Sequence, residues 1–549
     1  MKKLAAFMLV LCLLPIAAIA ETSDPTTYPW YGDMSNMPIS EETIELDVWA
    51  TGTNDVEDMF TNEMTLFYEE LTNVHVNWTY IVGDEATQKN LSLASGDYPD
   101  IYFAGMSTSE ILTYADAGVF IPLEDLIAEH APNIQKMFDT YPELAEMLTA
   151  PDGHIYSLAR GGTADHEEPP LKMWVFLPWM EQYMEATGAE EPKTLDELCD
   201  MLRYFRDNDM NGNGDATDEI PMFGNMQMPD QGSDPLYYLM NAFTYFPANL
   251  EYGDGEKAYF AAQGEKYREG LQYIRGMVEE GLISETVWTT DLNTMRSVVN
   301  VTSPEEMIVG TCAAPYVMRF VTEAIYPRAC EDFFVLEPII GPDGYQVTPD
   351  GERAVWPNTV ITSACEDPVA AIKWLDGLQA RYIQIWNHWG DEGTDWEWTG
   401  EYDEVNGPEI RLHSTSLMEE GASTQNRRWT WWLNNIYVPG KWQTNTLEPT
   451  GQLTQTEVNN AAYAVYEPYI QYTNIPNIVW NADEDFILEM NEMHNLIWDY
   501  AKNMYTQFVL GTLDINDDTV WADYESQLYE TYQLDKYLEM RATYWYGEA

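Results

Sequence analysis

The stretch TIELDVW, residues 43–49, decides the fold class because it begins a strand–helix–strand unit. Its apolar and polar residues alternate, which is typical of a half-buried strand. Residues 54–71 then carry apolar side chains at helical spacing, and residues 74–80 alternate again. A strand, a helix and a second strand in this order are the start of a parallel sheet. We therefore expect an α/β fold whose mainly parallel sheets are flanked by helices.

The rest of the chain extends this pattern beyond one lobe. A chain of 549 residues is too long for a single small core. Residues 101–104, 172–176 and 307–310 are further strand candidates, and the part from about residue 483 onward is largely helical. We expect the following division: a flexible leader at 21–40, residues 41–160 plus 304–350 in lobe 1, and residues 161–303 plus 351–549 in lobe 2.

The charge balance argues against some classes of partner. The chain has 26 Lys and Arg residues against 92 Asp and Glu residues, a formal net charge of −66. Such a field repels phosphate backbones and anionic lipid, so nucleic-acid and membrane-surface binding are not expected. Many of the 20 Trp and 36 Tyr residues must lie in cores, but a surplus of this kind also suits a sugar-binding site.

The N-terminus has the pattern of an export signal. Lys2 and Lys3 precede an apolar run, residues 4–16, that is too short to span a membrane comfortably. Ala18-Ile19-Ala20 is a small-x-small cleavage site, so residues 1–20 are predicted to be a signal peptide. Cys12 lies inside the apolar run and does not have the setting of a lipid-attachment cysteine. The protein is therefore expected to be exported: extracellular, at the cell surface or periplasmic.

Four cysteines remain beyond this signal: Cys199, Cys312, Cys330 and Cys365. Export permits disulfides, and four cysteines allow three pairings. The nearest pair in sequence is Cys312 and Cys330, and free buried thiols are equally compatible with the pattern. None of the four has a CxxC spacing, so redox and zinc chemistry find no support.

A loop at residues 207–219, DNDMNGNGDATDE, has the spacing of a calcium site. A helix at 195–205, started by a capping box of Thr194 and Glu197, leads into it. Oxygen ligands recur at alternate positions and Gly212 falls where such a loop turns sharply, which suits structural Ca²⁺. The predicted metal ligands are Asp207, Asp209, Asn211, Asn213, Asp215 and Asp218, with Glu219 as the alternative closing ligand. An Asx/Gly turn without metal is the other interpretation.

Several short motifs, in order along the chain, carry a resemblance to one family. They are LASGDYPDI (93–101), GVFIPL (118–123), DGHIY (152–156), NGNG (211–214), DEIP (218–221), EEGLI (279–283), EGTDW (392–396), WADY (521–524) and LDKY (534–537). Together they resemble the extracellular solute-binding proteins (family 1) of ABC-type importers, in the branch that takes up oligosaccharides. The calcium loop resembles that of the alginate-binding members.

The resemblance implies a two-lobed periplasmic-binding-protein-like fold that closes on a ligand held between its lobes. It implies an exported, monomeric protein that captures a solute, expected to be an oligosaccharide, and delivers it to the membrane permease of an ABC importer. It also implies no catalysis. The alternatives are a secreted polysaccharide-acting hydrolase and a calcium-dependent surface lectin. With 92 acidic residues, a pair of carboxylates for hydrolysis is always available and is therefore uninformative.

A sugar site needs flat aromatic rings for its C–H faces and polar groups for its hydroxyls. The candidate ligand-binding residues are Trp49, Trp356, Trp389, Trp396, Trp429, Arg427 and Arg160. We expect at least two of the tryptophans to face the ligand, whereas core packing is the alternative for each one. The arginines could hold an acidic sugar through paired hydrogen bonds. Pairing with nearby acidic residues is the alternative for them.

Overall fold

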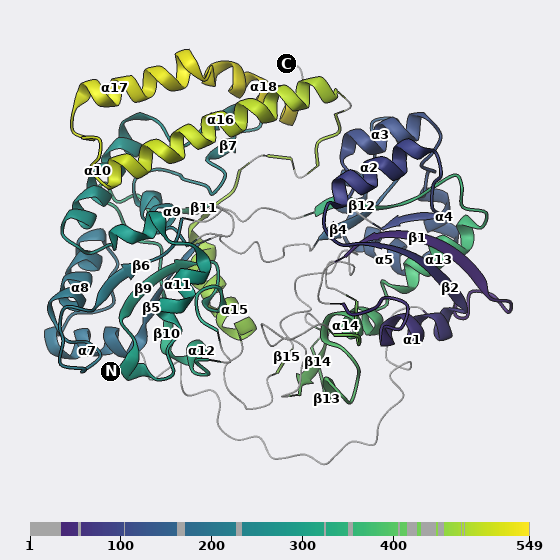
Figure 1. Cartoon of the computed structure of the whole chain (residues 1–549), viewed down its shortest axis with the longest axis horizontal. Helices are drawn as coiled ribbons and strands as arrows, with labels where there is room; N and C mark the ends of the chain where they lie inside the picture. Colours follow the sequence, from purple (N-terminus) through teal and green to yellow (C-terminus); the bar gives the residue numbers. More distant parts are fainter. Residues whose placement is uncertain are drawn as a thin grey trace.

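The computed structural model describes residues 34–52, 56–103, 105–161, 171–226, 233–322, 325–349, 355–403, 407–413, 425–429, 446–447, 455–473, 475–476, 478–481 and 483–547. The predicted signal peptide and most of the predicted leader lie outside the described residues. Two lobes lie side by side, each with its own sheet and its own helices (Figure 1).

The first lobe is built on a five-stranded sheet. Its strands, in spatial order, are β2 (Val74–Ile81), β1 (Ile44–Thr51), β3 (Ile101–Phe103), β12 (Val355–Ile361) and β4 (Leu158–Gly161). β1 pairs in parallel with β2 and β3, whereas β12 runs antiparallel to β3 and β4. The helices of this lobe are α1 (Glu63–Thr72), α2 (Glu85–Ser95), α3 (Thr108–Asp116), α4 (Glu124–His130), α5 (Pro132–Thr140), α6 (Pro142–Leu148), α13 (Pro368–Gly377) and α14 (Arg381–Trp389). A small sheet of β13 (Trp396–Asp403), β14 (Gly407–Leu412) and β15 (Thr446–Leu447) follows α14.

The predicted strand–helix–strand opening is confirmed. Leu46 and Val48 of β1 point into one core, and Trp49 points to the other face of the sheet, as alternation requires. The helix begins later than predicted because the side chain of Asn62 caps it, accepting a hydrogen bond from the backbone N–H of Met64 at 3.1 Å. It ends at Asn73, whose left-handed backbone turns the chain directly into β2.

The second lobe has a four-stranded sheet. Its strands, in spatial order, are β10 (Phe333–Leu336), β5 (Lys172–Phe176), β9 (Val309–Ala314) and β6 (Ile220–Phe223). Its helices are α7 (Leu177–Thr187), α8 (Leu195–Asp207), α9 (Leu236–Leu239), α10 (Gly264–Glu279), α11 (Leu292–Val299), α12 (Ala329–Asp332), α15 (Gln455–Tyr466), α16 (Glu484–Val509), α17 (Asp518–Ser526) and α18 (Leu534–Tyr546). A hairpin of β7 (Glu251–Gly253) and β8 (Ala258–Phe260) completes it. The predicted helical C-terminal part is confirmed, and it forms the outer layer of this lobe (Figure 1).

The two-lobed α/β fold is confirmed, but the sheets are mixed rather than mainly parallel. In the second sheet β6 joins β9 in parallel, while β5 runs antiparallel to β9 and β10. The antiparallel pairs have a topological cause. β4 leaves the first lobe and β12 returns to it, and likewise β5 enters the second lobe and β10 leaves it. Strands that carry the chain out and back must run in opposite directions.

The predicted division between the lobes is wrong in its second half. Residues 304–350 were expected in lobe 1, yet β9 and β10 pair with the strands of the second sheet. The part after residue 351 was expected in lobe 2, yet β12 lies in the first sheet, and α13 and α14 pack against its core. The first lobe therefore contains the strands and helices from β1 to β4 and from β12 to β15, and the second contains those from β5 to β10 and the helices from α15 onward. Strand periodicity indicates that a strand exists but not which sheet accepts it.

Short extended segments connect the lobes. β11 (Thr348–Pro349), which lies between β10 and β12, pairs in parallel with β16 (Ile470–Gln471), which lies between α15 and α16. The four described cysteines, Cys199, Cys312, Cys330 and Cys365, are buried free thiols, so the Cys312–Cys330 pairing does not occur. None of the described helices combines the length and apolar composition needed to cross a membrane.

Candidate functional site

Two of the predicted ligand-binding residues, Arg160 and Trp356, form a pair at the edge of the first sheet. They are directly opposite each other in the antiparallel pair of β4 and β12. The guanidinium carbon of Arg160 lies 5.7 Å from the centre of the Trp356 ring, within the range of a cation–π contact. β4 and β12 lie on the side of the first lobe that faces the second (Figure 1). The pair therefore stands where the chain leaves the first lobe and returns to it.

The chemistry of this pair suits a polyhydroxylated ligand. Trp356 is 43% exposed, which is unusual for so large an apolar side chain and leaves part of its ring available for stacking. Arg160 is partly buried, and this burial lowers the pKa of its guanidinium to about 10, so it stays charged at neutral pH. An aromatic surface beside fixed N–H donors can hold the C–H face and the hydroxyls of one sugar ring.

Asn358, two residues after Trp356 on β12, is a buried polar neighbour of this pair that was not among the predicted site residues. It is 1% exposed, and its Nδ2 donates to Thr359 Oγ1 at 3.1 Å. Its Oδ1 has no hydrogen-bond partner among the described residues, although a buried acceptor without a partner is costly. The only sequence signal for it is its place two residues after Trp356.

Three predicted stacking residues, Trp49, Trp396 and Trp429, belong to the core instead. Trp396 and Trp429 are 0% and 1% exposed, and Trp49 is 4% exposed. The indole N–H of Trp396 donates to Gly390 O at 2.8 Å, and that of Trp429 donates to Thr65 Oγ1 at 2.7 Å. The indole N–H groups of Trp396 and Trp429 are thus satisfied inside the first lobe. For these three tryptophans the structure therefore contains the alternative of core packing rather than a ring exposed to a ligand.

The two remaining candidates lie in the same lobe. Trp389 is half-buried at the end of α14 and packs against the core of the first lobe. Arg427 pairs with Asp395, whose side chain is fully buried, at 2.5 Å between Nη1 and Oδ1. Arg427 is therefore paired with a local acidic residue, as the alternative interpretation expected. Of the predicted ligand set, Arg160 and Trp356 are the two that the structure brings together.

The predicted calcium loop is wound around the carboxylate of Asp209. Asp209 Oδ1 accepts the backbone N–H groups of Gly212 (2.8 Å) and Asn213 (3.1 Å), and Oδ2 accepts that of Gly214 (2.9 Å). Gly212 and Gly214 have left-handed backbones, φ 75° and 92°, which the tight turn requires. Asn211 Oδ1 accepts the N–H of Asn213 at 3.0 Å. Asp209 therefore has the place of the first residue of the loop.

Two carboxylates close over this loop. Glu219 reaches back so that its Oε1 accepts the N–H of Met210 at 2.8 Å, and Asp218 Oδ2 accepts from Asn213 Nδ2 at 2.7 Å. Their other oxygens, Glu219 Oε2 and Asp218 Oδ1, are buried and have no partner within the described chain. Burial, together with the charges of Asp218 and Asp209, raises the pKa of Glu219. Unpartnered buried carboxylate oxygens close to other carboxylates are the environment that a hard cation would satisfy.

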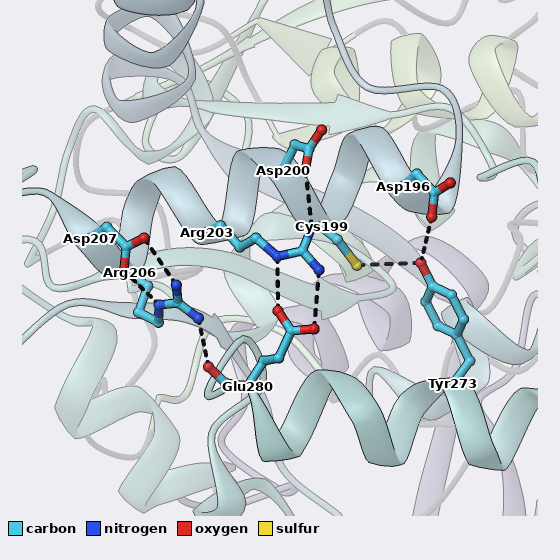
Figure 2. A network of polar contacts seen from close by, with 8 residues as sticks. All are labelled: Asp196, Cys199, Asp200, Arg203, Arg206, Asp207, Tyr273 and Glu280. Atoms are coloured by element: carbon cyan, nitrogen blue, oxygen red, sulfur yellow. Dashed lines mark hydrogen bonds and ion pairs between the residues drawn. The ribbon is translucent and has the colours of Figure 1, made fainter.

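Two predicted metal ligands point elsewhere. Asp207 is held by its neighbour Arg206, with Nε and Nη2 at 2.7 and 2.9 Å, and this lowers the pKa of the carboxyl. Arg206 also donates to Glu280 O, so Asp207 belongs to the network that joins α8 to the end of α10 (Figure 2). The Asp215 carboxylate accepts from Thr217 and is exposed. In the described part of the chain no group of three His, Cys, Asp or Glu side chains is arranged to hold a metal.

The fold defines the class of protein. A solved extracellular solute-binding protein from Bifidobacterium longum subsp. infantis aligns with a TM-score of 0.75 at 20% identity, covering 92% of this chain and 99% of that chain. The alginate-binding protein AlgQ2, solved without calcium ion, aligns with a TM-score of 0.57 at 18% identity, covering 92% and 99%. No family model matches the chain. The fold is that of the two-lobed solute-binding proteins.

The comparison of sequences gives a more specific relationship than the comparison of folds. The chain is 29% identical, over 496 residues, to the fructooligosaccharide ABC transporter substrate-binding protein FusA of Streptococcus pneumoniae, covering 87% of this chain and 85% of FusA. The structure of FusA in complex with kestose aligns with a TM-score of 0.69 at 25% identity, covering 91% and 98%. The chain is therefore a homologue of ABC transporter substrate-binding proteins, which are not enzymes. The hydrolase and lectin alternatives receive no support from these comparisons.

Proposed function

We propose that this protein captures an oligosaccharide between its two lobes and delivers it to the membrane permease of an ABC importer. The observation that carries the proposal is the Arg160–Trp356 pair, an exposed aromatic ring beside a cation, on the two strands β4 and β12 that lie on the side of the first lobe toward the second. The relationship to FusA over most of both chains supports it.

Capture by lobe closure is compatible with the architecture. Each lobe has its own buried core, and extended segments rather than a shared core connect them. Two rigid bodies joined by a few extended residues can rotate toward each other, because the change in backbone angles is confined to those residues. A ligand that contacts both lobes then favours the closed arrangement by its differential affinity.

The proposed ligand class is based on the Arg160–Trp356 pair and on the relationship to FusA. FusA is named for fructooligosaccharides and has been solved with kestose, which makes kestose the first probe to use here. We propose export by way of residues 1–20 and action as a monomer.

The test is a titration of the chain from Glu21 onward with kestose, an alginate oligosaccharide, a short neutral peptide and glucose, followed by calorimetry. Small-angle scattering with and without ligand reports closure. The proposal expects saturable binding of an oligosaccharide, a smaller radius of gyration at saturation, and recovery of the sugar intact. Hydrolysis of the sugar, or binding of the peptide alone, would overturn it.

We also propose that the loop at 209–219 holds a structural Ca²⁺. The proposed ligands are the side-chain oxygens of Asp209, Asn211, Asn213, Asp218 and Glu219. The unpartnered buried oxygens of Asp218 and Glu219 support it. A solved FusA structure is described as an EF-hand mutant, which also supports the proposal. The ion would tie the end of α8 to the start of β6 and stiffen the second lobe.

A further inference from the structure

A segment between α15 and α16 leaves the second lobe and touches the first. α15 and α16 both pack in the core of the second lobe, through residues such as Tyr466 and Met490. Between them the chain forms β16, which pairs with β11, and then runs between the lobes to the start of α16 (Figure 1). Residues 478–481, which we call the strap, make the contact with the first lobe.

The strap contacts the first lobe through two apolar side chains. The indole N–H of Trp480 donates to the backbone carbonyl of Met147, the penultimate residue of α6, at 3.0 Å. The half-buried Trp480 ring packs against the apolar cluster on one face of the first sheet, the cluster that contains Tyr102 and Phe120. Ile478 packs against the cluster on the opposite face. The strap therefore contacts the apolar clusters on both faces of the first sheet.

The other end of the strap is fixed to the second lobe. Asn481 Oδ1 accepts the N–H of Asp483 at 2.8 Å, and Asp483 caps α16 by accepting the N–H of Phe486 at 3.0 Å. A displacement of Trp480 is thus passed to the first turn of a long helix anchored in the second lobe. The strap starts and finishes in the second lobe, so no topological reason requires it to touch the first.

We propose that the strap positions the two lobes for capture and that Trp480 is the positioning residue. This inference rests on the proposed function and names how that same site is regulated. The crossing segments alone leave the lobes free to rotate. A contact made by the second lobe on the first restricts that rotation, so that less orientational freedom is lost when a ligand aligns the lobes. Loss of the contact lowers the fraction of molecules that are competent to bind.

The experiment compares Trp480→Ala and Trp480→Phe with a matched control, Trp498→Ala. Trp498 is a half-buried tryptophan of α16 that packs only within the core of the second lobe. Small-angle scattering without ligand, the association rate and Kd for kestose, and Tm are measured for each variant. We expect Trp480→Ala to broaden the distribution of lobe arrangements and to raise the Kd about fivefold or more, mainly through a slower association rate. Trp480→Phe, which keeps an apolar ring, should restore part of this loss.

The outcomes separate positioning from mere stability. If Trp480→Ala and Trp498→Ala lower Tm alike while scattering and Kd stay at wild-type values, Trp480 is only a packing residue and the inference is wrong. Tighter binding by Trp480→Ala would also overturn it, because the contact would then oppose closure. If wild-type protein binds no saccharide, the proposed function fails, but the scattering comparison still decides whether the strap sets the lobe arrangement.

Discussion

Asp395 and Arg427 form an ion pair that fixes the start of the small sheet of the first lobe to residues 425–429, which lie between β14 and β15. Arg427 Nη1 lies 2.5 Å from Asp395 Oδ1, and Asp395 Oδ2 accepts the backbone N–H of Asp391 at 2.9 Å. The Asp395 side chain is fully buried, whereas that of Arg427 is 35% exposed. The arginine therefore compensates a carboxylate that water cannot reach, and it is occupied by this task rather than by a ligand.

Replacing this arginine should cost stability and leave sugar affinity intact. Arg427→Ala leaves the Asp395 carboxylate buried with one partner fewer, which should lower the free energy of unfolding by about 2–4 kcal/mol. The control is Arg411→Ala, because Arg411 pairs with Glu397 at 3.5 Å on the surface and should cost less than about 0.5 kcal/mol. Thermal unfolding and kestose titration check both. An unchanged Tm with lost binding would instead assign Arg427 to the ligand.

Calcium should stabilise the wild-type protein. An ion bound to the folded state alone at about 100 times its Kd adds about 2.7 kcal/mol, so a chelator should lower Tm by several degrees. Asp209→Ala removes the carboxylate around which the loop is wound and should abolish the response to calcium. The matched control is Asp207→Ala in the same loop, which should keep the response because Asp207 is paired with Arg206. If Asp207→Ala abolished the response to calcium and Asp209→Ala kept it, the calcium loop would begin at Asp207 rather than at Asp209.

Asp234 should make the stability of the second lobe depend on pH. Its carboxylate is buried and accepts from Tyr505 Oη at 2.6 Å and from the N–H of Leu236 at 2.9 Å. Burial raises the pKa of Asp234 to about 6. Between about pH 4 and pH 6 the folded state thus holds a proton that the unfolded state has lost. The contribution of this group to the free energy of unfolding therefore falls as pH rises through that window.

The pH effect is best measured as a difference between variants, because the other carboxylates then cancel. The free energy of unfolding of Asp234→Asn minus that of wild type should rise by roughly 2–3 kcal/mol from pH 4 to pH 7. Asp254→Asn is the control, because the same difference in the free energy of unfolding should change with pH in the opposite direction for this variant. The pKa of Asp254 is lowered to about 2, chiefly by its hydrogen bond from Tyr259, so its change should be confined below about pH 4. If the difference in the free energy of unfolding between Asp234→Asn and wild type did not change from pH 4 to pH 7, the Asp234 carboxyl would be ionised over that whole range.

The exposed tryptophan of the first lobe should decide affinity for the sugar. Trp356→Ala removes the stacking surface and should raise the Kd for kestose at least about tenfold, the equivalent of 1.4 kcal/mol. Phe60→Ala is the control, since Phe60 is another exposed aromatic residue of the same lobe, 53% exposed. Arg160→Lys should weaken binding less than Trp356→Ala because it keeps the charge but loses the planar group. Equal Kd values for all three variants and wild type would place the ligand elsewhere.

Local sequence patterns predicted the local elements well. The opening strands, the capping box of Thr194 and Glu197, and the helix it starts are all confirmed, because each depends on residues a few positions apart. The two-lobed class followed from motifs spread along the chain, and the fold comparisons confirm it. These signals are visible in one sequence because their physical cause is local or because their order is distinctive.

Features that depend on which side chains meet in the folded chain were not predictable in the same way. Residues 307–310 were predicted as a strand, but the sheet that β9 joins, like the sheet that β12 joins, is decided by partners far along the chain. The burial of Trp396 and Trp429 depends on Gly390 and Thr65, and no spacing rule marks these partners. The register of the calcium loop turned on whether Asp207 or Asp209 faces inward, which Arg206 decides.

The place of β12 in the middle of the first sheet has a consequence for how the molecule is made. β12 separates β3 from β4, yet it follows every strand of the second sheet in the sequence. A chain growing from its N-terminus therefore exposes an unpaired edge of β3, and the whole of β4, until that second sheet has been synthesised. Unpaired edges are where nascent chains associate wrongly. The N-terminal 161 residues are thus not an independent folding unit, and the first sheet can be completed only after the chain up to Ile361 has been released.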